Sequence, residues 1–181
     1  MALQHEKIYT IEHIYTLPEG QRAELINGQM HMMAPPTRVH QKLISELTQH
    51  IGRYIKTKGR KCEIYPAPFA VFLNADEETY VEPDISVICD KSKLNDHGCA
   101  GAPDFVIEVV SPSSRRMDYS TKMTLYLNSG VREYWIVDPE KKRTTIYCFE
   151  EDAAPVIFPF DDKITSGIYE DLTVCIAEML N

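Results

Sequence analysis

The feature that most constrains the fold is a single acidic residue, Glu108, inside the otherwise apolar segment 105–110. This segment is rich in β-branched residues and is typical of a strand whose two faces are both covered by protein. An unpaired carboxylate in such a strand would cost several kcal/mol or would lose its charge. We therefore expect Glu108 to have a metal ion or a lysine side chain as its partner.

A second segment, residues 81–88, repeats this design and carries Asp84 into another apolar strand. Carboxylates on neighbouring strands make a cation site, because hard divalent ions take carboxylate oxygens as ligands. The sequence therefore predicts that Asp84 and Glu108 bind a metal ion together.

Hydrophobic periodicity and turn residues predict the remaining elements. The N-terminal part is expected to contain a short helix at 10–17, a hairpin at 22–26 and 29–33, and a long helix at 37–58. Asn27 and Gly28 suit a type I′ turn at the tip of the hairpin. A second helix is expected to begin with Asp118 as its cap and to end before Gly130. Further strands are predicted at 62–65, 69–73, 132–137, 143–149, 156–159 and 172–176, with a polar loop at 90–102.

This order of elements is typical of an α/β domain with a mixed central sheet and a helix on each side. The connection from the Glu108 strand through the second helix to residues 132–137 has the length of a βαβ unit, so these strands should be parallel. We expect a single domain over residues 1–181, with an N-terminal hairpin and extra C-terminal strands. Ligands tend to bind near strand ends in such sheets, where Glu108 and the loop Ser111-Pro112-Ser113-Ser114 fall.

Lys122 is the expected partner of Glu108. The predicted sheet-facing stripe of the second helix consists of Tyr119, Met123, Tyr126 and Leu127. Lys122 lies three residues after Tyr119 and four before Tyr126, so it should point toward the sheet. The alternative is a buried structural ion pair with no chemistry. Asp84 argues against this alternative, because a structural pair needs no second carboxylate.

Net charge, the length of apolar runs and the positions of the cysteines limit the classes of protein to which this chain can belong. The formal net charge of -8 over 181 residues argues against a protein that coats nucleic acid nonspecifically. The sequence shows neither an apolar run of roughly 20 residues, as a membrane helix needs, nor the pattern of a secretory signal. We therefore expect a cytoplasmic protein without membrane contact. The cysteines are scattered and are expected to be reduced thiols rather than disulfides or a zinc site: Cys62, Cys89, Cys99, Cys148 and Cys175.

The candidate residues belong to an ordered set of motifs. The set comprises Glu24-Leu25-Ile26-Asn27-Gly28, His40, Glu82-Pro83-Asp84-Ile85, residues 103–113, Asp118 with Lys122 and Tyr126, and residues 130–139. In this order it resembles the Uma-type restriction endonucleases, a bacterial branch of the PD-(D/E)XK nuclease superfamily. The resemblance implies a restriction-endonuclease-like core in which Asp84 matches the motif aspartate and Glu108 the second acid. The superfamily usually has a lysine two residues after that acid, where this chain has Val110, and the resemblance implies that Lys122 replaces it.

The motif residues are those expected of an enzyme that uses a metal ion to hydrolyse DNA phosphodiester bonds. Asp84, Glu108 and the backbone carbonyl of Val109 would hold Mg²⁺ or Mn²⁺, with water completing the coordination shell. Lys122 would orient the attacking water or neutralise charge that develops on the phosphate oxygens.

Glu24 and His40 are expected to contribute to catalysis from a second layer around this centre. For Glu24, an ion pair on the surface of the hairpin is an equal alternative, and His40 could equally be a capping or core histidine. His31 is expected to be structural or solvated. The loop Ser111-Pro112-Ser113-Ser114 either touches phosphate or only leads into the helix.

Three basic clusters are candidates for contacts with nucleic acid. Arg115-Arg116 is favoured because it lies between the acidic strand and the helix that carries the lysine. The clusters at 56–61 and 141–143 are expected to be solvated charges. A small enzyme that cuts both strands of a duplex needs two active sites, so we also expect a homodimer.

Two other classes of function stay open. A noncatalytic nucleic-acid-binding or regulatory module on the same fold would fit an acidic surface, but it leaves the retained acids unexplained. A glycosidase-like hydrolase would need an acid pair without an inward lysine and usually a cleft rich in aromatic residues. The single tryptophan, Trp135, lies inside an apolar strand, which disfavours this last class.

Overall fold

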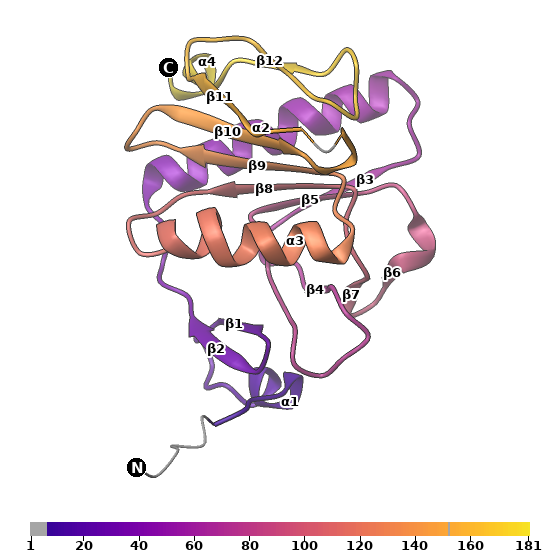
Figure 1. The fold of residues 1–181 in the computed structure, drawn as a ribbon, viewed down its shortest axis with the longest axis vertical. Coiled ribbons are helices and arrows are strands. Elements are labelled where there is room, and N and C mark those ends of the chain that lie inside the picture. Colours follow the sequence, from indigo (N-terminus) through magenta and orange to yellow (C-terminus); the bar gives the residue numbers. More distant parts are fainter. Residues whose placement is uncertain (1–6, 152) are drawn as a thin grey trace.

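A mixed β-sheet forms the centre of the structure (Figure 1). The computed structural model describes residues 7–151 and 153–181. Within these residues the central sheet has six strands in the order β11-β10-β9-β8-β5-β3. Their bounds are β3 Glu63–Pro66, β5 Ile85–Ile88, β8 Phe105–Val109, β9 Glu133–Asp138, β10 Arg143–Cys148 and β11 Val156–Pro159. β8 and β9 are parallel, as predicted, whereas the other neighbouring strands are antiparallel.

Helices cover the two faces of this sheet (Figure 1). On one face lies α2, Arg38–Thr57, against which the C-terminal helix α4, Ile176–Leu180, packs. On the other face lies a helix that contains a π-helical segment, Met117–Lys122, and continues as α3, Met123–Ser129. The predicted α/β fold is therefore confirmed. In the part of the chain that the structure describes, no helix is both long and apolar enough to cross a membrane.

The central strands bury side chains on both faces. Ile107 and Trp135 pack on the side of α2, whereas Val106 and Ile136 pack on the side of α3. Complete burial of an aliphatic or aromatic side chain contributes about 1.5 to 3 kcal/mol to stability. Because both faces are covered, a charged side chain on β8 requires a partner close by.

The predicted N-terminal hairpin consists of β1, Ala23–Ile26, and β2, Gln29–Met32. Its turn residues Asn27 and Gly28 have φ angles of 50° and 75°, and a type I′ turn requires positive φ at both positions. Leu25 exchanges two backbone hydrogen bonds of 2.7 Å with Tyr80. The hairpin is thereby attached to the segment that leads to Asp84.

The remaining elements are short. They are α1 Ile11–Tyr15, β4 Val71–Phe72, β6 Leu94–Asn95, β7 Gly98–Ala100, β12 Ile164–Thr165, β13 Thr173–Val174, and the 3₁₀ turns Lys91–Lys93 and Phe149–Glu151. The prediction of an irregular loop at 90–102 was wrong, because β6 and β7 lie there. β7 pairs in parallel with the distant β4, a contact that no local sequence pattern reveals.

The predicted start and stripe of the second helix also need correction. Asp118 does not cap this helix; it lies within the π-helical segment and is buried. Leu127, predicted to face the sheet, is 47% exposed, and Leu125 is buried in its place. A π-helical turn contains more residues than an α-helical turn, so it rotates the buried stripe relative to a regular helix. Lys122 nevertheless faces inward, as predicted.

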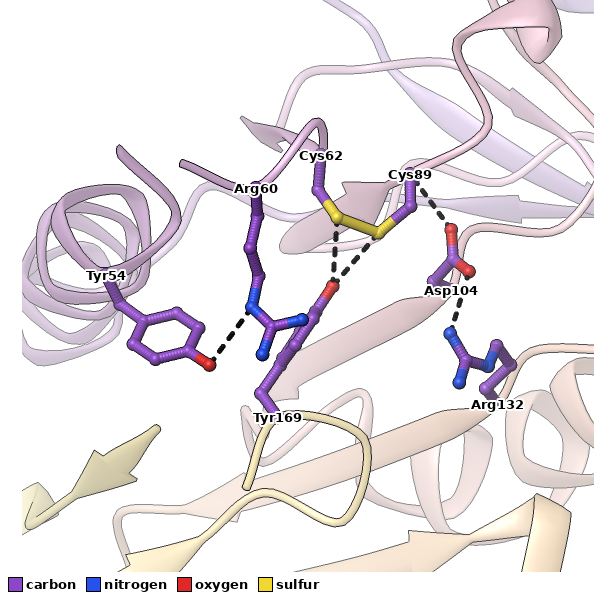
Figure 2. Close-up of a disulfide and its surroundings, with 7 residues drawn as sticks. All are labelled: Tyr54, Arg60, Cys62, Cys89, Asp104, Arg132 and Tyr169. Carbon is purple, nitrogen blue, oxygen red and sulfur yellow. Dashed lines mark hydrogen bonds and ion pairs between the residues drawn. A yellow bond between two sulfur atoms is a disulfide. The ribbon is translucent and has the colours of Figure 1, made fainter. Parts of the chain in front are cut away.

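The prediction of reduced cysteines was wrong for one pair, Cys62 and Cys89, which form a disulfide (Figure 2). The register of β3 and β5 pairs Glu63 with Ile88, so the residues just beyond this pair face each other. The Tyr169 hydroxyl lies 3.2 Å from the Cys89 sulfur. Spacing in sequence could not reveal this pair, because it depends on strand register. Three cysteines are free, as predicted: Cys99, Cys148 and Cys175.

Candidate active site

All five predicted catalytic residues line one cleft, which has a volume of about 670 Å³. They come from different elements: Glu24 from β1, His40 from α2, Asp84 from the residue before β5, Glu108 from β8 and Lys122 from the end of the π-helical segment. Val109, whose carbonyl was predicted to be a metal ligand, lines the same cleft. We call it the acidic cleft.

Asp84 is held by a backbone amide and by a histidine. Its Oδ2 accepts a hydrogen bond of 2.8 Å from the Val109 amide. The same oxygen lies 3.2 Å from Nε2 of His40, and both side chains are 13% exposed. The amide of Asp84 lies 3.4 Å from Oε2 of Glu108. These contacts bring the two predicted metal ligands together.

Glu108 shares Lys122 with a second carboxylate. The ammonium nitrogen of Lys122 lies 2.9 Å from Oε1 of Glu108 and 2.9 Å from Oε2 of Glu24. The Tyr126 hydroxyl donates a further hydrogen bond of 2.7 Å to Oε1 of Glu108. Glu24 also accepts a 2.9 Å hydrogen bond from the Glu82 amide and is only 5% exposed. The surface pair considered for Glu24 is therefore not what the structure shows.

Sequence reasoning missed the part that Asp118 takes in this cluster. The side chain of Asp118 is 2% exposed, lines the cleft, and accepts a hydrogen bond of 2.6 Å from the Ser114 hydroxyl. Asp118 precedes Lys122 by four residues, a spacing that places two side chains on the same helical face. That spacing was the available signal, but the assignment of Asp118 as a helix cap concealed it.

The buried charges shift one another's protonation. Desolvation, with the nearby carboxylates of Asp84 and Asp118, raises the pKa of Glu108 well above its ordinary value. Desolvation also raises the pKa of Asp118 to about 6. For Lys122, desolvation opposes the charge, but Glu108 and Glu24 outweigh it and raise the pKa. Glu108 and Asp118 thus keep their protons to higher pH than free carboxylic acids do.

The pKa of His40 depends on its contact with Asp84. Burial lowers the pKa of His40, but the hydrogen bond and charge of Asp84 outweigh burial, so the net shift is upward. The Thr37 hydroxyl accepts a hydrogen bond from the backbone amide of His40, so Thr37, not His40, provides the cap of α2. The side chain of His40 is therefore free to contact Asp84.

The donor set fits a divalent ion such as Mg²⁺. Asp84 Oδ1 accepts no hydrogen bond from the residues that the structure describes, and Glu108 Oε2 has only the 3.4 Å amide contact. Residues 7–151 and 153–181 contain no group of three or more His, Cys, Asp or Glu side chains that could hold an ion by themselves. Mg²⁺ typically binds through one or two carboxylates and keeps several water ligands. The two carboxylates and the Val109 carbonyl match this coordination preference of Mg²⁺.

The serine loop forms one rim of the cleft, but its hydroxyl groups mainly contact one another. The Ser111 hydroxyl lies 3.1 Å from that of Ser113 and 3.1 Å from that of Ser114. In the favoured basic cluster Arg115-Arg116, Arg115 forms ion pairs with Asp138 and Glu140, whereas Arg116 is exposed.

A sequence comparison matches residues 9–173 to the Uma2 family, which is described as "Putative restriction endonuclease". The match spans most of the chain and includes every residue of the acidic cleft. The chain belongs to the Uma2 family. This confirms the resemblance inferred from the motifs, and the family description supports a nuclease function.

Two further proteins and one solved structure are similar to this Uma2 chain. "Uncharacterized protein slr1290" of Synechocystis sp. is 25% identical over 135 residues, which cover 74% of this chain and 70% of that protein. "Uncharacterized protein sll1609" of the same organism is 25% identical over 121 residues, covering 65% and 67%. The crystal structure of "a putative nuclease belonging to DUF820" from Anabaena variabilis matches with a TM-score of 0.76 and 20% identity, covering 94% and 97% of the two chains. At that identity the likeness shows the fold alone.

Proposed function

We propose that this Uma2 chain is a metal-dependent endonuclease that hydrolyses DNA phosphodiester bonds in the acidic cleft. The observation that carries the proposal is that one cleft contains four carboxylates and one buried ammonium group: Glu24, Asp84, Glu108 and Asp118 with Lys122. A structural ion pair would need one carboxylate. The additional acids are explained if the cleft binds a divalent cation that neutralises them.

Each residue of the cleft has a role in this proposal. Asp84 and Glu108, with the Val109 carbonyl, would hold Mg²⁺ or Mn²⁺, which when bound polarises the phosphate and acidifies a water molecule. His40 orients the Asp84 carboxylate through the 3.2 Å contact. Lys122 uses two of its three N–H donors on Glu24 and Glu108, which leaves one for a water molecule or a phosphate oxygen.

The proposal is tested by cleavage and by metal-dependent stability. We expect the wild type to cleave DNA with Mg²⁺ or Mn²⁺ and to lose this activity in EDTA. The double variant Asp84→Asn/Glu108→Gln should be inactive. The metals should raise the melting temperature of the wild type but not of this variant, because only a ligand of the native site stabilises by mass action.

A matched control is Glu170→Gln, which removes an exposed carboxylate outside the cleft. It should behave as the wild type does in cleavage and in melting. Absence of both metal-dependent cleavage and a metal-dependent melting shift in the wild type would overturn the proposal.

A noncatalytic nucleic-acid-binding module is the second candidate. The observation in its favour is that Lys122 already contacts two carboxylates, while Val110 occupies the usual lysine position. Binding of DNA without cleavage, unaffected by metal or by Asp84→Asn/Glu108→Gln, would favour this candidate. If the enzyme cuts duplex DNA, we further propose a homodimer, because a two-fold axis would provide one cleft for each strand.

A further inference from the structure

The lining of the acidic cleft differs in chemistry from one part to another. β8, the residue before β5 and the π-helical segment contribute Glu108, Asp84, Asp118 and Lys122. The hairpin and its connection to α2 contribute, beside Glu24, the apolar residues Met33, Pro35 and Pro36, which we call the apolar wall. These three residues are absent from both hydrophobic cores of the described chain, and each keeps some exposure to solvent. Apolar side chains that line a cleft and not a core are available to a ligand.

The register of the hairpin directs Met33 into the cleft. Directly paired residues of antiparallel strands share one face, and Glu24 is paired with His31. The Met33 amide donates a hydrogen bond of 2.9 Å to the Arg22 carbonyl, which extends the ladder by one pair beyond β2. Met33 therefore shares the face of Glu24, the face that meets Lys122.

Three basic side chains in or beside the cleft are already engaged. Lys122 contacts two carboxylates, Arg22 pairs with Glu82, and the guanidinium group of Arg115 pairs with Asp138 and Glu140. Arg116, the neighbour of Arg115, is exposed. Proteins bind duplex DNA mainly through contacts between basic side chains and phosphates. With a formal net charge of -8 and these three cations engaged, the cleft offers few free cations to the phosphates of a duplex.

We propose that the apolar wall binds unpaired nucleobases, so that the substrate is DNA that is single-stranded at the scissile phosphate. This inference rests on the proposed nuclease function of the same cleft. An unpaired base exposes its π-face, and methionine sulfur makes favourable contacts with aromatic rings. In a duplex, neighbouring bases cover those faces, and the wall would have nothing to contact. The prolines that follow Met33 restrict the backbone, so the wall is preformed.

Binding without cleavage tests the proposal directly. The inactive Asp84→Asn/Glu108→Gln protein is titrated in EDTA with labelled oligonucleotides of one sequence, as single strand, blunt duplex and duplex with a single-stranded flap. We expect the single strand and the flap to bind at least about tenfold more tightly than the duplex. Adding Met33→Ser should weaken single-strand binding by about tenfold and leave the weak duplex binding unchanged.

A single-stranded oligonucleotide that lacks one base tests the proposal a second time, without any substitution in the apolar wall. Removing the base beside the scissile phosphate should weaken binding as much as Met33→Ser does. The two changes together should not add, because they remove the same contact. The matched control is Ile157→Ser on β11, which removes a 55% exposed apolar side chain outside the cleft and should change no affinity.

The outcomes separate this proposal from the nuclease proposal. Equal affinity for single strand and duplex, or no effect of the abasic site, would overturn the base-binding wall. If the wild type cleaved duplex DNA as fast as single-stranded DNA in the presence of metal, the base-binding wall would also be overturned, whereas the nuclease proposal would be supported. Selective single-strand binding that depends on Met33, without cleavage by the wild type, would support the wall and contradict the nuclease.

Discussion

At the scale of single residues, Lys122 is held between two carboxylates in a buried position. Glu24 and Glu108 each lie 2.9 Å from its nitrogen. Desolvation of buried ions is costly and is offset only when the geometry is good and further hydrogen bonds are present. The Tyr126 hydroxyl supplies one such bond to Glu108. Lys122 is therefore important for stability as well as for the proposed chemistry.

We expect Lys122→Met to lower the free energy of unfolding by about 3 to 5 kcal/mol without metal, because two buried carboxylates lose their counter-charge. Mg²⁺ should restore part of this loss by binding the same acids. Denaturant unfolding of both proteins with and without Mg²⁺ measures the effect. The double variant Glu24→Gln/Lys122→Met should lose less than the single variant. A loss below about 1 kcal/mol for Lys122→Met would contradict the buried cluster.

Asp118 gives the cleft a defined dependence on pH. Its pKa of about 6 in the folded protein lies above the ordinary value of 3.8, chiefly because of desolvation. Between these pH values the folded state keeps the Asp118 proton and the unfolded state loses it. Stability contributed by this group is therefore present below pH 3.8 and lost as pH rises through about 6.

Asp118→Asn should remove this pH dependence. At pH 7 the variant is expected to be more stable than the wild type by up to about 3 kcal/mol, because no charge has to be buried. Near pH 4 the two proteins should differ little. Melting curves of both proteins between pH 4 and pH 7 test this, and a wild type that is the more stable one at pH 7 would refute the assignment.

At the scale of elements, the disulfide of Cys62 and Cys89 joins the edge strand β3 to β5. It closes a loop of 27 residues, for which the chain-entropy model gives about 3 to 4 kcal/mol of stabilisation. We expect dithiothreitol to lower the free energy of unfolding by about this amount, as measured in urea. Cys62→Ser/Cys89→Ser should show no response to the reductant, and an equal response of both proteins would disprove the prediction.

The elements also show which features the sequence could predict. The length of the connection sufficed for the parallel pair β8 and β9, and local periodicity and turn residues sufficed for α2 and the hairpin turn, because these depend on neighbouring residues. The inward position of Lys122 was predictable for the same reason. The disulfide, the pairing of β4 with β7 and the engagement of Arg115 by Asp138 depend on strand register and distant contacts. The π-helical turn itself has no simple sequence signal, although the spacing of Asp118 and Lys122 placed them on one helical face.

At the scale of the whole molecule, charge and oligomeric state bear on the type of substrate. The homodimer was predicted because a duplex has two strands to cut. An enzyme that takes single strands needs only one cleft, so its activity should not require a dimer. Light scattering across a range of concentrations, combined with cleavage of single-stranded DNA, separates these cases. Activity that disappears when a dimer dissociates would favour the duplex enzyme.

The net charge also predicts how salt affects binding. Each phosphate contact with a single strand contributes about -0.7 to the slope of log K against log salt concentration. Among the cleft residues of the described chain, Arg22 and Lys122 are the arginine and lysine side chains, and both are paired with acids. We therefore expect a slope between about 0 and -1.5 for single-stranded DNA. Titrations at several salt concentrations provide this slope, and a value steeper than about -4 would show that phosphate contacts, not the apolar wall, hold the substrate.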